Sequence, residues 1–254
     1  MATVRRLAPA ALLVTALAVA TAACGTSSGT HSAAASLSPK AVSDPLAGWT
    51  AQRIAKQAQA DTVDAPYVRV TGNVTSSGLQ ITFDLTMVAG TGCQGSLTEH
   101  GVGSFMLVSL GKNVWVKPDS QFYKNEAGQN PDAQTAATLL AGKYLEDTEG
   151  TGLGSLASSC SLHGMLGNAT QTAADDSLNA KAGTATIDGQ RALKLLNVGQ
   201  HATVYVTDTT KPVILQIIVS GSGGGSLSFS YYTTAPAITP PPASETIEGS
   251  KYGL

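Results

Sequence analysis

The sequence predicts an α+β fold built on a single, strongly curved antiparallel sheet of about 11 strands, with helices packed on its concave face. Three observations predict it. One amphipathic helical pattern opens the domain, two runs of short alternating segments follow, and a helix-prone stretch separates the two runs. The 254 residues are 43% hydrophobic and 13% charged, so the chain carries enough apolar side chain for a large core.

The first 23 residues have the pattern of an export signal. Arg5 and Arg6 form a positive start, an apolar stretch runs from Leu7 to Ala20, and small residues precede Cys24. This order resembles the lipobox of bacterial lipoproteins, in which the cysteine is diacylated and becomes the new N-terminus. We therefore expect a signal peptide over residues 1–23 and lipidation at Cys24. The alternative is an ordinary signal peptide followed by an incidental cysteine.

Residues 24–45 have few large apolar side chains and no periodicity, which is typical of a flexible tether. The domain proper is expected over residues 46–254. Removing Arg5 and Arg6 leaves 15 − 2 = 13 basic residues against 17 acidic ones, a formal charge of −4. No Lys/Arg-rich run remains, so a nucleic-acid partner is not expected. These features predict a protein held by a lipid anchor on the extracytoplasmic face of the cell membrane.

The first half of the domain is expected to be a helix and a meander. Helical spacing runs from Trp49 to Val63 and stops before Pro66. The clearest strand is Leu79–Val88, in which apolar and polar residues alternate. Turn residues separate the other expected strands, which are Tyr67–Val74, Gln94–His100, Ser104–Leu110, Val114–Lys117 and Gln121–Asn125.

The periodicity then changes. Asn130-Pro131-Asp132 is a helix start, the segment Ala133–Ala141 is helix-prone and Gly142 ends it, and a second helix is expected over Leu153–Leu166. Strands resume at Ala182–Ile187, Arg191–Asn197, Ala202–Thr207, Val213–Ser220 and Ser226–Tyr232. An extended, proline-rich tail at 239–243 closes the domain.

The cysteines fit an oxidising compartment. With Cys24 assigned to lipid, Cys93 and Cys160 remain as an even pair, which predicts a disulfide between them. A redox or metal pair is the alternative, but the sequence has no CxxC motif and no histidine at ligand spacing.

Taken together, these segments resemble the actinobacterial LppX/LprG-type lipoproteins, which share the half-open barrel of the LolA/LolB lipoprotein carriers. The resemblance spans most of residues 46–254. It is carried by the lipobox and tether, the first helix, the strand Leu79–Met87, and the segments VSLGKNVWVKPDSQF (108–122), VYVTDTTKPVILQI (204–217) and GGGSLSFSYYTTAPAITPPPA (223–243).

The resemblance implies a hydrophobic cavity between sheet and helices that holds the acyl chains of a lipid or lipoglycan. Such a protein acts as a lipid carrier or chaperone, with a membrane transporter as a candidate partner. The residues expected to line the cavity are Val68, Val70, Ile81, Phe83, Leu85, Met87, Leu139, Leu140, Leu156, Leu215, Ile217 and Phe229. Two alternatives stay open: these residues fill an ordinary core, and the protein is an extracytoplasmic interaction or accessory lipoprotein without lipid cargo.

No motif predicts an enzyme, a cofactor or a metal. Gly90 to Gly95 matches GxGxxG literally, but a strand-rich segment follows it and no βαβ unit surrounds it. His100, His163 and His201 are expected on the surface or in loops, and the domain over residues 46–254 has no GxSxG nucleophile elbow. The acidic pairs 146–147 and 175–176 are adjacent rather than opposed, which is typical of solvated turns.

Overall fold

The computed structural model describes residues 44–76, 78–128, 130–147, 160–166, 178–199, 201–221 and 223–248. The expected signal peptide, most of the tether and Cys24 therefore lie outside the described residues. So do most of the helix expected over Leu153–Leu166 and the acidic pair at 175–176. No described helix is long and apolar enough to cross a membrane.

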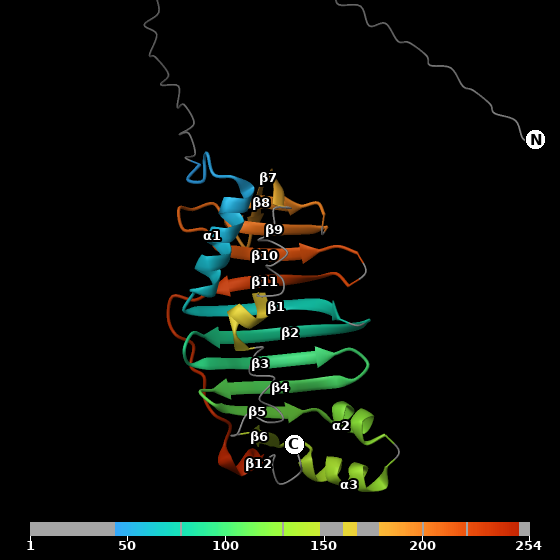
Figure 1. Ribbon diagram of the computed structural model, residues 1–254. Coiled ribbons are helices and arrows are strands. Elements are labelled where there is room, and N and C mark those ends of the chain that lie inside the picture. Colours follow the sequence, from blue (N-terminus) through green and yellow to red (C-terminus); the bar gives the residue numbers. More distant parts are fainter. Residues whose placement is uncertain are drawn as a thin grey trace, which may run out of the picture. The chain divides into compact units, whose positions relative to one another are not determined.

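The described strands form one sheet in the order β12-β6-β5-β4-β3-β2-β1-β11-β10-β9-β8-β7 (Figure 1). β1 is the central junction, because it pairs antiparallel with both β2 and β11. The sheet does not close, since β12 and β7 lie at its two ends. The strands are β1 (Tyr67–Ser76), β2 (Leu79–Val88), β3 (Gly92–Glu99), β4 (Gly103–Leu110), β5 (Asn113–Pro118), β6 (Tyr144–Asp147), β7 (Leu178–Ile187), β8 (Gln190–Asn197), β9 (Ala202–Thr207), β10 (Ile214–Val219), β11 (Gly225–Tyr231) and β12 (Thr246–Glu248).

The predicted fold class is confirmed, with differences at one edge of the sheet. The described part of the chain has 12 strands rather than about 11, because β6 and β12 had not been expected. β12 pairs parallel with β6, so the sheet is mixed rather than purely antiparallel. The pair Glu146-Asp147, expected in a solvated turn, belongs to β6, and Asp147 is buried.

One expected strand is wrong. The segment Gln121–Asn125 lies inside the helix α2 (Ser120–Ala127), not in a strand. Asp119 caps this helix by accepting a hydrogen bond from Phe122 N at 2.7 Å, and its other carboxylate oxygen accepts one from Ser104 N on β4 at 3.0 Å. The Pro118-Asp119-Ser120 segment is therefore a helix start. A short loop then leads to α3 (Pro131–Leu140), which begins with proline as expected.

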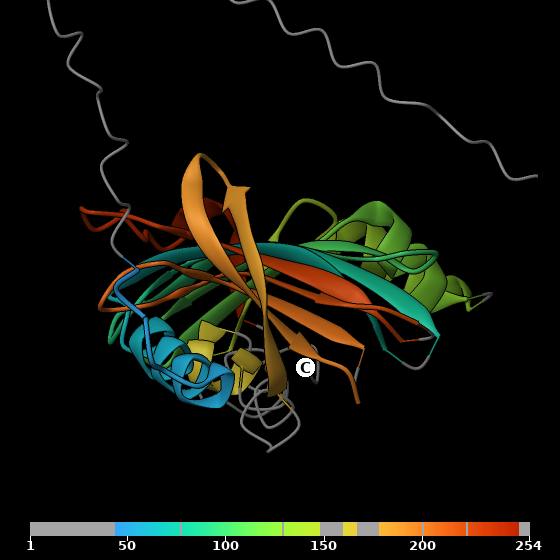
Figure 2. The same ribbon diagram turned by 90° about the horizontal axis from the view of Figure 1, so that it is seen from above.

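Helix α1 (Ala51–Val63) defines the inner face of the sheet, the face that it covers. Its N-cap, Thr50, accepts a hydrogen bond from Arg53 N, and Ile54, Ala55 and Ala58 are buried in the core. Figure 2 shows α1 and residues 160–166 on one side of the sheet. The extended segment after β11 runs on the opposite side, which is called the outer face below.

Candidate functional site

The centre of the inner face brings together apolar side chains from three adjacent strands. Val68 lies opposite Met87, and Val70 lies between Leu85 on β2 and Phe229 on β11. All five are buried members of one hydrophobic cluster, as are Phe83 and Ile217. Seven of the twelve residues expected to line a cavity therefore share one apolar surface. The alternation along Leu79–Val88 places them there, since residues two apart share a face.

Four of the other five expected residues do not join this surface. Ile81 is only half-buried, and Leu215 is buried but lies outside the cluster. Leu139 and Leu140 belong to α3, which packs on α2 rather than on the inner face, and Leu139 is 71% exposed. Leu156 lies outside the described residues. The helix-prone pattern in α3 gave no indication of which element it would pack against.

A disulfide links the inner face to its cover. Cys93 on β3 is bonded to Cys160, with 5.2 Å between their Cα atoms. Cys93 is fully buried, and after Cys160 a helical turn at 162–166 places Leu162 and Leu166 in the core cluster. The inner face is thus covered by α1 over β7, β9 and β10, and by residues 160–166 near β3.

A pocket of about 390 Å³ opens where these two covers meet the sheet. We call it the mouth. Its lining comes from the end of α1, the β2–β3 and β4–β5 turns, and the disulfide-linked turn; it comprises Val63, Ala65, Met87, Val88, Ala89, Gly90, Thr91, Gly92, Ser109, Gly111, Cys160, Ser161, Leu162 and His163. Met87 and Leu162 belong to both the mouth and the buried cluster. The pocket therefore borders the buried apolar cluster at these two side chains.

The mouth suits an uncharged apolar group. Its lining residues include no Asp, Glu, Lys or Arg, and the one titratable side chain among them, His163, is exposed. Of these residues, sequence reasoning had named Met87, Cys160, His163, and Gly90 and Gly92 of the GxGxxG match. Those glycines form the β2–β3 turn and the start of β3, and no helix follows them as a nucleotide site requires. No sequence pattern identified Ala65, Thr91 or Leu162 as neighbours.

The histidines lie apart from one another. His100, His163 and His201 are all exposed, and the Nε2 atom of His100 lies 3.1 Å from Thr82 Oγ1. Within the described ranges, no group of three or more His, Cys, Asp or Glu residues is placed to hold a metal ion.

No protein-family model matches the chain, and no curated protein matches it. Solved structures do. LprF from Mycobacterium bovis is 13% identical in sequence, with a TM-score of 0.48. The match covers 75% of this chain and 96% of the LprF chain. The Mycobacterium tuberculosis lipoprotein LppX is 17% identical with a TM-score of 0.47, covering 78% of this chain and 100% of its own.

A conserved protein from Thermus thermophilus is 10% identical with a TM-score of 0.36, covering 78% of this chain and 98% of its own. LppX is one of the two lipoproteins after which the family that the sequence resembles is named. All three TM-scores are below 0.5, so the function has to be inferred from the geometry of this chain.

Proposed function

We propose that the protein is an exported, lipid-anchored lipoprotein that binds the acyl chains of a lipid or lipoglycan between its sheet and the cover of the inner face. The observation that carries this proposal is the mouth, an uncharged pocket that borders the apolar cluster at Met87 and Leu162. Ile81, Leu139, Leu140 and Leu215 lie outside the buried cluster and are not part of the proposed site.

The proportions of the fold support an interior that can admit a guest. Twelve strands about 4.8 Å apart give a sheet roughly 53 Å wide, whereas the 13 residues of α1 span only about 20 Å. α1 contacts β7, β9 and β10. Beyond it, residues 160–166 meet the sheet through one disulfide, the two buried leucines Leu162 and Leu166, and the partly buried Met165. These contacts are between side chains, so the turn can move away from the sheet, as far as the disulfide allows, without breaking any strand pairing.

The energetics favour a carrier over a permanent binder. Moving about fifteen methylene groups out of water is worth roughly 12 kcal/mol at about 0.8 kcal/mol each. A bilayer offers the lipid most of the same gain, so the protein has only to match the bilayer in order to exchange cargo with it. Anchoring through Cys24, with a tether over residues 24–45, would keep the domain within reach of that membrane. A membrane transporter that supplies the cargo is a candidate partner.

Uptake of a fluorescent fatty acid by the delipidated protein tests the proposal, together with native mass spectrometry of the protein as purified. Wild type should retain a copurified lipid and take up the probe. Thr91→Trp should reduce uptake, because Thr91 is an exposed residue of the mouth and a tryptophan there narrows the opening without entering the core.

Lys112→Trp is the matched control, since Lys112 is an exposed residue of the β4–β5 turn that does not line the mouth. It should take up the probe as wild type does. A wild-type protein that holds no lipid and takes up no probe would overturn the proposal. That result would favour the interaction or accessory lipoprotein with a closed core.

A further inference from the structure

The outer face carries a second surface of different chemistry. Two neighbouring cross-strand rows run over β1–β4: Arg69, Thr86, Gln94 and Val108 in one, and Asp84, Ser96 and Met106 in the other. Each row follows the register of the sheet, so its side chains stand side by side across the strands. Most are polar and point away from the core cluster that holds Leu85 and Leu107.

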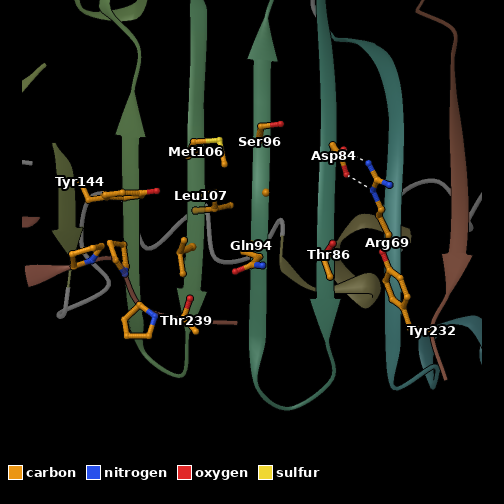
Figure 3. A pocket seen from close by; sticks show the side chains of 15 residues that line it. Arg69, Asp84, Thr86, Gln94, Ser96, Met106, Leu107, Tyr144, Tyr232 and Thr239 are labelled. Atoms are coloured by element: carbon orange, nitrogen blue, oxygen red, sulfur yellow. Dashed lines mark hydrogen bonds and ion pairs between the residues drawn. The ribbon is translucent and has the colours of Figure 1, made fainter. Parts of the chain in front are cut away.

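These rows form the floor of a groove of about 590 Å³ (Figure 3). Tyr232 stands beside Arg69 at one end, and Tyr144 lies at the other. Thr239 and Pro240–Pro242 belong to the chain segment that crosses the outer face and form a wall of the groove. This wall is fixed just beyond the prolines, where Lys117 Nζ lies 3.2 Å from Glu245 Oε2 and Lys143 Nζ donates to Ser244 O at 2.9 Å.

The groove is electrically neutral. Arg69 Nε and Nη2 donate to the two carboxylate oxygens of Asp84, at 2.7 and 2.5 Å, and no other charged residue lines the groove. The hydrogen bond from Arg69 holds the pKa of Asp84 below its ordinary 3.8, so the pair stays ionised and balanced at neutral pH. A groove without net charge gives no electrostatic preference for a cation or an anion.

Unused hydrogen-bonding capacity lines the same floor. The guanidinium of Arg69 has five N–H donors, and Asp84 accepts only two of them. The side chains of Thr86, Gln94 and Ser96 make no hydrogen bond to any part of the chain that the structure describes, although all three are half-buried. These groups are therefore free to bind a polar ligand.

Apolar surface alternates with these polar groups. Met106 is 44% exposed and Tyr232 is 38% exposed, so two of the large apolar side chains that this protein leaves open to solvent lie in this groove. Three strand spacings separate Arg69 from Val108, which is about 14 Å. The groove therefore fits an extended ligand rather than a single small ring.

We propose that this groove binds a neutral, extended saccharide. Hydroxyl groups would pair with Gln94, Ser96 and the free N–H groups of Arg69, and the apolar faces of the sugar rings would pack on Tyr232 and Met106. A peptide strand fits less well, because strand addition requires a free sheet edge, and the main-chain groups of β1–β4 are already paired. The site is independent of acyl binding on the inner face.

Isothermal titration calorimetry with neutral linear oligosaccharides of glucose, mannose and galactose, none bearing an acyl chain, tests the proposal. At least one series should bind, and more tightly as its chain lengthens. Gln94→Ala should raise the Kd about fivefold through the lost hydrogen bonds, and Tyr232→Ala should raise it about three- to tenfold. The matched controls Gln216→Ala and Tyr205→Ala, on the same face at β10 and β9, should leave it unchanged.

Asp84→Asn gives an independent readout. It leaves Arg69 without its counter-charge, so binding should shift from neutral oligosaccharides toward those that contain uronic acids. Absence of binding to every neutral series, or equal affinity of wild type, Gln94→Ala and Tyr232→Ala, would overturn the proposal. Fatty-acid uptake should be unchanged in all these variants. A simultaneous loss of uptake would show that the substitutions had damaged the fold rather than the groove.

Discussion

The hydroxyl oxygens of Thr62 and Tyr231 lie 3.2 Å apart, and both side chains bind the backbone of Ile214. Ile214 N donates to Thr62 Oγ1 at 2.9 Å, while Tyr231 Oη donates to Ile214 O at 2.6 Å. Ile214 begins β10 just before a register shift against β9, where the regular strand pairing is interrupted. The last turn of α1 is therefore joined to the sheet by polar contacts as well as by apolar packing.

Tyr231→Phe should lower the free energy of unfolding by about 1–3 kcal/mol, because it leaves the buried carbonyl of Ile214 without its donor. Urea denaturation of the purified protein measures the change. Tyr205→Phe is the control, since Tyr205 is half-buried on the outer face of β9 and should change stability little. Equal urea midpoints for the two variants would mean that the hydrogen bond from Tyr231 to Ile214 O does not contribute to the free energy of unfolding.

Asp119 should make the protein less stable in acid. Burial raises the pKa of its carboxyl, but hydrogen bonds from Phe122 N and from Ser104 outweigh that effect and hold the pKa below 3.8. A carboxyl whose pKa is lowered on folding stabilises the folded state above its unfolded pKa, and this contribution is lost as the pH falls through the folded value. Unfolding curves between neutral pH and pH 2 should therefore show stability falling below about pH 4.

Asp119→Ala tests the same group at neutral pH. Removing the cap of α2 should cost about 1–2 kcal/mol and flatten the acid part of the profile relative to wild type. Ser120→Ala serves as the control, because no hydrogen bond of its side chain supports the helix start within the described residues. An unchanged acid profile in Asp119→Ala would assign the pH dependence to other carboxyl groups.

The same aspartate shows why part of the fold could not be predicted from the sequence. The strand Leu79–Val88 was predictable because its alternation is local and strict. Helix α2 was not predicted, although its cap from Asp119 to Phe122 N is local, because Pro118-Asp119-Ser120 is equally typical of a turn between strands. β12 has only three residues and pairs parallel with β6, an arrangement without any local signature.

The candidate sites also differ in how far they could be predicted from the sequence. The inner-face cluster could be predicted, since burial follows from alternation along β1 and β2. The mouth and the outer groove could not, because each depends on strand register and on a segment distant in sequence. For the mouth that segment begins at Cys160, and for the groove it contains Pro240–Pro242. The alternation along Leu79–Val88 predicts that Asp84 and Thr86 share the polar side of that strand. It does not predict which residues of β1 and β3 lie beside them.

Removing the disulfide should loosen the cover before it affects the sheet. The bonded cysteines are 67 residues apart, so in the chain-entropy model the bond contributes about 4 kcal/mol to stability. In Cys93→Ala with Cys160→Ala, amide hydrogens of residues 162–166 should exchange faster than those of β2 and β4. Equal acceleration in the turn and in these strands would contradict this order of unfolding. Labelling that finds two free thiols in the unfolded, unreduced wild type would exclude the disulfide itself.

Cys24 should carry the membrane anchor, because the apolar stretch, the small residues before it and the tether after it all converge on this position. Wild type expressed in a lipoprotein-processing host should partition into the detergent phase, and Cys24→Ala into the aqueous phase. Gly25→Ala is a neighbouring control that keeps the cysteine. Partitioning of wild type into the aqueous phase after removal of the signal peptide would refute the anchor.

Substitution of Leu85 by tryptophan distinguishes a lipid cavity from a closed core. It is fully buried on β2, opposite Val70 on one side and Gly95 on the other. If the space beside it holds an acyl chain, Leu85→Trp fills that space, so probe uptake should fall while the thermal midpoint changes little. If the space is already filled by side chains, the added volume overpacks the core and costs about 1–3 kcal/mol of stability.

Phe83→Trp should behave in the same way, since Phe83 belongs to the same cluster. Gln80→Trp is the matched control on the exposed side of the same strand and should change neither quantity. Thermal midpoints that drop for both core variants, together with a wild type that takes up no probe, would refute the lipid cavity.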